Sequence, residues 1–191
     1  MPALDLYWIP LGAGTHVVRW SGRLFECIAA WWQHRPRADL YHAALIARTD
    51  AGDVVVEQAP VPDRDGAARG VVASGPVGLR CLGRWRLFRY EVRRWPGGVI
   101  PDLDAAVGAP ERVTEDPVVV ARVLETLATI PTPVWGRDEL GAGEMWNSNS
   151  VVAWTLVRAG VDADAIPFPP GGRAPGWRAG ITVARRPPMR F

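Results

Sequence analysis

The stretch WNSNSVVAWTLV, residues 146–157, carries the clearest structural signal in the chain. A tryptophan and four small polar residues lead directly into an apolar run. Ser and Asn are favoured at helix starts because their side-chain oxygens accept hydrogen bonds from the unpaired backbone N–H groups of the first turn. The pattern therefore predicts a helix over residues 151–159, capped by the Asn/Ser run and ended by Gly160, a residue type typical of helix C-termini.

The start of this helix is also a candidate catalytic site. Its backbone dipoles give it a partial positive charge, which favours a nucleophile or a developing oxyanion. Ser148 is the candidate nucleophile, and Asn147, Asn149 and Trp146 are candidates for the oxyanion site or the cleft around it. Because a serine hydroxyl is a weak nucleophile on its own, catalysis also requires a neighbouring base. In the alternative interpretation, Ser148 and Ser150 only cap the helix.

His42 is the candidate base, and it lies in a predicted strand over residues 40–47. Residues 54–58 form the predicted partner strand, and Glu57 is the only acid in its apolar run. A four-residue turn, 49–52, would leave Glu57 diagonal to His42 on the same face of the sheet, whereas a three-residue turn would place it on the other face. In the first register Glu57 can orient the imidazole as a triad carboxylate does. Without such a partner, a histidine in an apolar strand is an ordinary core residue.

The remaining patterns predict further helices and strands around this pair. They are an extended or irregular stretch at 3–20, a helix at 21–33, strands at 70–73, 84–95 and 181–184, and a helix that starts at Asp116-Pro117 with Val120, Val123, Leu124 and Leu127 in the core. Together they predict an α+β fold, in which an antiparallel sheet packs against helices. We expect one domain over residues 1–191, with its core at roughly 20–160 and a Pro/Gly-rich segment, 161–191, packed on it.

The composition is that of an ordinary globular protein, with 48% hydrophobic residues, 22% charged residues and a formal net charge of +2 over 191 residues. Lysine is absent, and many of the ten tryptophans are expected in the core. Cys27 and Cys81 do not form a metal-binding pattern and there is no phosphate-binding glycine loop, so we expect no metal ion and no cofactor. The N-terminus lacks a signal-peptide pattern and no apolar run is long enough to span a bilayer, which favours a cytoplasmic protein without a transmembrane segment.

Residues 80–94 form a basic stretch with six arginines and one glutamate. Such a run can contact phosphates, and its aromatic residues can stack on nucleic-acid bases. The small net charge of the whole chain argues against a nucleic-acid partner, while phospholipid head groups or another anionic ligand fit equally well. The structural alternative is a solvated face on which arginine stems cover tryptophans. Two loop segments, 135–138 and 173–177, are further candidates to flank a cleft.

Three segments, taken in order, resemble the circularly permuted branch of the NlpC-type papain-like superfamily, which includes the lecithin:retinol acyltransferase-like and phospholipid-acyltransferase proteins. Residues 41–45, YHAAL, resemble the histidine strand of that branch. Residues 55–60, VVEQAP, resemble the partner strand, with Glu57 at the place of its second polar residue. Residues 147–151, NSNSV, resemble the nucleophile segment at the start of a helix, where Ser148 replaces the cysteine of the family.

The resemblance implies a circularly permuted papain-like fold and the hydrolysis or transfer of an acyl group at an amide or ester, on a small-molecule, peptide or lipid substrate. In this hypothesis Ser148 is the nucleophile, His42 is the general base and then the acid, and Glu57 orients the imidazole. A thiol is partly ionised near neutral pH and a hydroxyl is not, so the replacement of cysteine leaves a second hypothesis open. It is a non-catalytic binding or interaction domain that retains the papain-like cleft.

Overall fold

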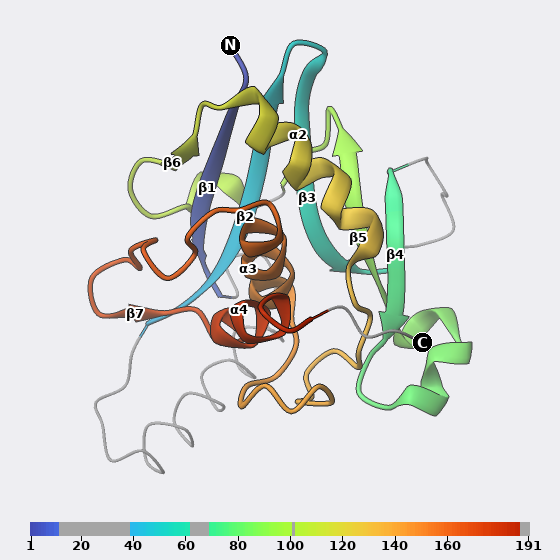
Figure 1. Ribbon diagram of the computed structural model, residues 1–191. Coiled ribbons are helices and arrows are strands. Elements are labelled where there is room, and N and C mark those ends of the chain that lie inside the picture. Colours follow the sequence, from blue (N-terminus) through green and yellow to red (C-terminus); the bar gives the residue numbers. More distant parts are fainter. Residues whose placement is uncertain (12–38, 62–68, 101, 188–191) are drawn as a thin grey trace.

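The sheet and its helices form the α+β arrangement that the sequence predicts. The computed structural model describes residues 1–11, 39–61, 69–100 and 102–187 (Figure 1). The sheet order is β4-β5-β3-β2-β1-β6, with antiparallel neighbours, and β7 adds a short parallel pairing to β2. The strand bounds are β1 Ala3–Pro10, β2 Asp39–Thr49, β3 Gly52–Pro60, β4 Val71–Pro76, β5 Arg89–Pro96, β6 Glu111–Thr114 and β7 Gly172–Arg173.

Three helices, α2, α3 and α4, lie in front of the sheet in Figure 1. Their bounds are α2 Pro117–Thr126, α3 Ser148–Arg158 and α4 Trp177–Ala184. Four short 3-10 helices lie in the connections of the described chain: η1 Arg80–Arg84, η2 Arg86–Phe88, η3 Leu103–Ala105 and η4 Leu127–Thr129. The α3 helix is the centre of this layer, because eight of its eleven residues are buried and it packs against both β2 and α4.

Two buried clusters occupy the two faces of the sheet. The larger one joins the α3 residues Val151 and Val152 to the β2 residues Ala43 and Leu45. The smaller one lies on the face that α3 does not cover and consists of Ile9, Ala44, Ile46, Val55 and Ile100. Because successive side chains of a strand point to opposite faces, even-numbered residues of β2 belong to the smaller cluster's face.

The register of β2 and β3 is the one that a four-residue turn predicts. Thr49 pairs with Gly52, and the ladder continues to the pair of Leu45 with Val56. His42 and Glu57 therefore lie on the same face of the sheet, as the first of the two alternative registers required. The same parity places both residues on the face away from α3.

The predicted strand at 84–95 is confirmed only from residue 89 onward, and the predicted strand at 181–184 is wrong. Residues 84–88 form the end of η1 and then η2, and β5 begins only at Arg89. The alternating pattern at 84–88 has no apolar face for a sheet to bury, since Trp85 and Leu87 are exposed. Residues 181–184 belong to α4, in which Trp177, Ile181 and Ala184 follow helical spacing into the core. Packing on α3 thus overrides the β-branched composition of this segment.

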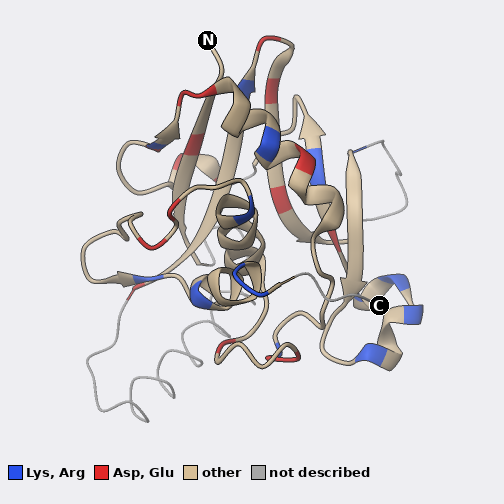
Figure 2. Cartoon of the chain, viewed as in Figure 1, with Lys and Arg blue, Asp and Glu red and all other residues tan. Residues whose placement is uncertain are grey.

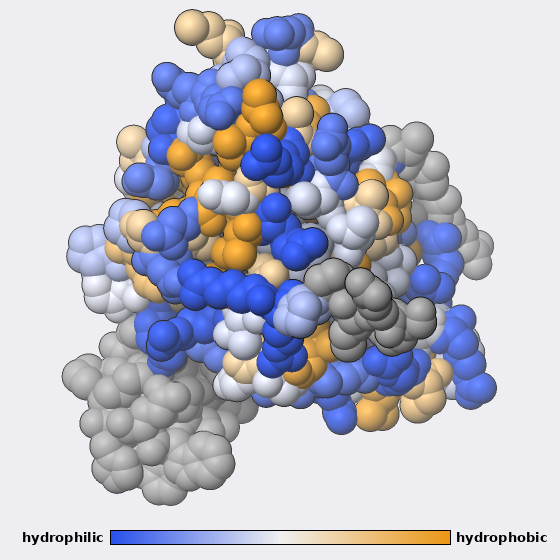
Figure 3. Space-filling model, viewed as in Figure 1, coloured by the Kyte–Doolittle hydropathy of each residue, from blue (hydrophilic) through white to orange (hydrophobic). Residues whose placement is uncertain are grey.

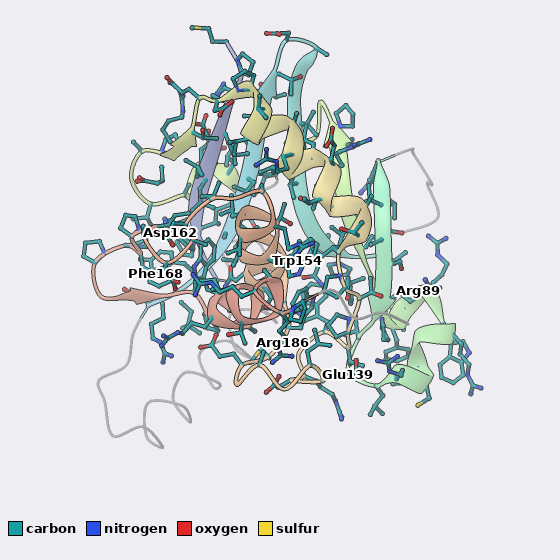
Figure 4. The ribbon with its side chains drawn as sticks, in the orientation of Figure 1. Arg89, Glu139, Trp154, Asp162, Phe168 and Arg186 are labelled. Atoms are coloured by element: carbon teal, nitrogen blue, oxygen red, sulfur yellow. The ribbon has the colours of Figure 1, made fainter. Side chains whose placement is uncertain are left out.

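Residues 167–180 of the C-terminal segment contact β1 and α3. Phe168, labelled in Figure 4, lies on the segment before β7. Its ring contacts Trp8 edge-on with 5.2 Å between the centroids, and Trp8 Nε1 donates a hydrogen bond to the carbonyl of Pro167. Close to α3, a Cβ on Gly180 would lie 2.3 Å from the carbonyl oxygen of Ser150, so glycine permits the close approach of α4. The predicted helix at 21–33, with Cys27, lies outside the described residues.

Candidate functional site

The polar run at the start of α3 forms a helix cap. Asn147 is the N-cap, and its Oδ1 accepts hydrogen bonds from the backbone N–H groups of Asn149 (2.9 Å) and Ser150 (3.3 Å). In return, Ser150 Oγ accepts from the N–H of Asn147 at 3.1 Å, which completes a capping box. Asn147 Nδ2 donates to the carbonyl of Pro175 and ties the cap to the segment before α4. Asn147 therefore has a structural role, because its Oδ1 is hydrogen-bonded to the first turn of α3 and its Nδ2 to Pro175.

Asn149 joins the start of α3 to the backbone of β2. Its Oδ1 accepts from the N–H of Ala43 at 2.7 Å, and its Nδ2 donates to the carbonyls of Tyr41 (3.0 Å) and Pro175 (2.9 Å). The ladder between β2 and β3 ends at Leu45, so these two β2 groups lie beyond it. Asn149 is 1% exposed and supplies their hydrogen bonds in place of a neighbouring strand. The predicted oxyanion donor is therefore engaged within the fold.

Ser148 and His42 belong to two segments that are in contact, the start of α3 and β2, but their side chains are not hydrogen-bonded to each other. Asn149 bonds to the residues on both sides of His42, so the start of α3 contacts the strand that carries the histidine. Ser148 is half-buried, and its hydroxyl makes no hydrogen bond to any described residue. Strand alternation points His42 to the face of Ala44 and Ile46, away from α3. None of the described residues therefore provides a base within hydrogen-bond distance of the Ser148 hydroxyl.

Glu57 is held by an arginine and does not bond to His42. Its Oε1 accepts from Arg93 Nη1 at 2.8 Å, and Arg93 Nη2 also bonds to Glu91 and to the carbonyl of Pro60. Arg93 is 3% exposed, so this is a buried network in which one cation serves two carboxylates. The polar residue of β3 on the α3 side is Gln58, whose amide has no hydrogen-bond partner among the described residues. Gln58 lies in the segment VVEQAP, and the resemblance assigned no role to it.

Trp146, a candidate cleft residue, belongs to the core. It is 2% exposed and is packed in the larger buried cluster. Its backbone fixes the preceding loop, since its N–H donates to the carbonyl of Arg137 and its own carbonyl accepts from Gly136. Trp146 therefore anchors residues 136–137 and does not offer an open wall to a ligand.

His42 has a carboxylate neighbour other than the expected one. Burial lowers the pKa of His42, and the negative charge of Asp102 acts in the opposite direction without cancelling the effect. Asp102 precedes η3, whose Leu103 packs on the smaller cluster of that face. His42 is therefore mostly uncharged at neutral pH, and it lies on the face of the sheet away from α3.

This environment predicts a pH-dependent stability. In the unfolded chain His42 titrates near 6.5, and in the folded protein its pKa is lower. As the pH falls through 6.5 toward the folded value, the unfolded chain binds the proton first, so the free energy of unfolding decreases. We expect His42→Gln to flatten this slope between about pH 7 and pH 5. Urea unfolding of both proteins across that range measures it, and equal slopes would contradict the assignment.

A separate groove lies where β4, η2, β5 and the loop at 134–137 meet. Among the described residues its lining contains two arginines and no acid, together with an indole and apolar side chains: Pro60, Val77, Gly78, Leu87, Arg89, Trp135, Gly136 and Arg137. We call it the Arg89–Arg137 groove. Figure 4 shows Arg89 next to the short helices, across from the segment that carries Glu139.

The walls of the Arg89–Arg137 groove are fixed by backbone contacts. Trp135 forms a bridge to Val77, and its N–H donates to the carbonyl of Pro76 at 2.9 Å. The Trp135 ring also packs edge-on against the buried ring of Tyr90, with centroids 5.7 Å apart. On the other wall Arg89 Nε donates to Ser74 Oγ at 3.1 Å, which orients its guanidinium. Arg89 and the indole of Trp135 are therefore positioned by contacts within the fold, and the exposed Arg137 lies on the same groove.

A second groove adjoins the first and shares Arg137. Its other lining residues are Leu79, Arg80, Cys81, Val134, Asp138 and Glu139. Here Arg80 is paired with Glu139 at 2.8 Å, which holds the pKa of that carboxyl below its usual value. In the second groove Arg80 and Arg137 are therefore balanced by Asp138 and Glu139. The described lining of the Arg89–Arg137 groove adds Arg89 without a further acid.

Comparisons of the chain with family models, with curated proteins and with solved structures found no match. In the described part of the chain, none of the helices is long and apolar enough to cross a membrane. The same residues contain no group of His, Cys, Asp and Glu side chains placed to hold a metal ion.

Proposed function

We propose that this protein is a non-catalytic binding domain, and that its ligand is an anion with an apolar part held in the Arg89–Arg137 groove. The observation that carries the proposal is the described lining of that groove, in which Arg89 and Arg137 lie beside Trp135 and none of the described lining residues is a carboxylate. A guanidinium binds carboxylate or phosphate through paired N–H donors, while the indole and neighbouring apolar side chains bury a hydrocarbon group.

The alternative function, acyl transfer through Ser148, finds less support. It requires a base at the hydroxyl and a carboxylate behind that base. Among the described residues Ser148 has no hydrogen-bond partner, and Glu57 is bound to Arg93. Asn147 and Asn149, the expected oxyanion donors, are engaged in the cap and in the contact with β2. These contacts favour the binding hypothesis, in which serine stands where the resembling family has a nucleophile.

Calorimetry with octyl phosphate tests the proposal, with octanol and inorganic phosphate as probes that lack one half of the ligand. We expect octyl phosphate to bind most tightly, because only it uses both the arginines and the apolar wall. Arg137→Gln should weaken this binding by about tenfold, equivalent to about 1.4 kcal/mol. Arg137 is exposed, so the substitution should leave folding unchanged.

Arg158→Gln is the matched control, since it removes the same charge from an exposed position on α3, where the guanidinium contacts only the ring of Trp154 among the described residues. If both variants lost the same affinity for octyl phosphate, the loss would be due to the lower net charge of the protein. That result would contradict the assignment of the binding site to the Arg89–Arg137 groove. Equal binding of octyl phosphate and octanol would overturn the anionic character of the ligand.

A further inference from the structure

A projection with exposed apolar side chains stands beside the Arg89–Arg137 groove. It consists of residues 79–88, which include η1 and η2, and neither of these helices has a buried residue. Leu87 is 84% exposed, Trp85 48% and Leu79 43%. A solvent-exposed Leu is unremarkable alone, but three large apolar residues within nine positions form a patch that marks an interaction surface.

Arginines surround these apolar side chains. The projection carries Arg80, Arg84 and Arg86 and no acid (Figure 2). The Arg84 guanidinium lies over the Trp85 ring, 4.2 Å from its centroid. The space-filling view shows apolar atoms between hydrophilic ones at this edge of the molecule (Figure 3). Apolar tips and positive charge therefore occur on the same short projection.

We infer that this projection docks the protein on an anionic lipid bilayer. Trp and Leu side chains partition into the boundary between head groups and acyl chains, and arginines at the same level bind lipid phosphates. Each basic residue near an anionic membrane adds to this attraction. The projection supplies both kinds of group from two helices that have no buried residue, and Arg80 also pairs with Glu139.

The apolar tips favour a bilayer over a nucleic acid. Stacking on bases uses Trp85 and Phe88, but Leu79 and Leu87 have no comparable partner in a single strand. A bilayer, in contrast, buries aliphatic and aromatic side chains together. The inference rests on the proposed function in one respect, because it identifies the bilayer as the source of the anionic ligand in the adjoining groove.

Sedimentation with vesicles tests the inference on the full chain. The probes are vesicles of phosphatidylcholine alone and vesicles of equal parts phosphatidylcholine and phosphatidylglycerol. We expect binding to the anionic vesicles only, and a loss of about fivefold or more in Trp85→Ser, equivalent to about 1 kcal/mol. Trp85 lines neither groove, so this variant should bind octyl phosphate as the wild type does.

Failure of the bilayer inference and failure of the groove proposal give different results. If wild type and Trp85→Ser bind octyl phosphate but neither sediments with anionic vesicles, the inference is overturned and the groove stands. Sedimentation that Trp85→Ser does not reduce also overturns it. Tighter binding to a single-stranded oligonucleotide than to anionic vesicles would assign the projection to nucleic acid instead. Unchanged thermal unfolding of Trp85→Ser shows that the variant is folded.

Discussion

Replacing Arg93 by Met lowers the free energy of unfolding by about 3 kcal/mol or more. Arg93 is 3% exposed and bonds to Glu57 and Glu91, which are 17% and 19% exposed. Without the guanidinium, two carboxylates face each other on neighbouring strands with little water to separate them. Urea unfolding measures the change, which is the largest that we expect from any single substitution of a charged residue in the described part of the sheet.

The neighbouring Arg94 offers a matched control on the same strand. It is exposed and makes only a long contact, 3.4 Å, to the carbonyl of Leu124. Arg94→Met should therefore cost less than about 1 kcal/mol. Similar losses from both variants would show that the Glu57–Arg93–Glu91 network contributes little. That result would leave Glu57 available for the role beside His42 that the sequence suggested.

Replacing Asn149 by Ala costs about 3 kcal/mol, because it leaves the backbone groups of Ala43 and Tyr41 buried without partners. The same change separates the start of α3 from β2 and removes one of the two bonds to Pro175. Thermal and urea unfolding report the loss.

Ser148→Ala is the control for Asn149→Ala, since it removes a side-chain oxygen one position earlier in the same helix turn. Its hydroxyl has no hydrogen-bond partner among the described residues, so we expect a change within about 0.5 kcal/mol. A destabilisation as large as that of Asn149→Ala would contradict the division of roles in this turn. Hydrolysis of acyl esters that Ser148→Ala abolishes would restore the catalytic hypothesis.

Local signals predicted the elements that frame the site. The Asn/Ser run and Gly160 mark the ends of α3, and Asp116-Pro117 marks the start of α2, where Asp116 caps the N–H of Val118. Such caps depend on a few adjacent residues, so the sequence is enough to find them. For the register of β2 and β3 the sequence left two turn lengths open, and the pairing of Thr49 with Gly52 in the structure decides between them.

Long-range packing decided what the sequence could not. Residues 181–184 have β-branched side chains but form a helix on α3, and residues 84–88 alternate in polarity but form 3-10 turns. Among the site residues, Glu57 lies on the predicted face, yet its partner is Arg93 on β5, which is not adjacent in sequence. A local pattern shows which residues of a strand share a face, but it does not show which cation of another strand pairs with a carboxylate on that face.

The Arg89–Arg137 groove shows the same division. The basic stretch 80–94 and the loop 135–138 were each recognisable as candidates for a binding surface. Their meeting depends on the bridge between Val77 and Trp135, which brings together segments nearly sixty residues apart. The groove is built from four segments of the chain, so no single stretch of sequence predicts it. The sequence indicates that basic and aromatic residues are present in these segments, and the fold shows that they meet in one groove.

The most direct measurement is a crystal structure of the protein with octyl phosphate. Binding in the groove predicts the phosphate between the guanidiniums of Arg89 and Arg137 with the alkyl chain along Trp135, and an unmodified Ser148. A phosphate bound at the start of α3 within hydrogen-bond reach of Ser148, with the groove empty, would contradict the proposed function and favour the papain-like catalytic site.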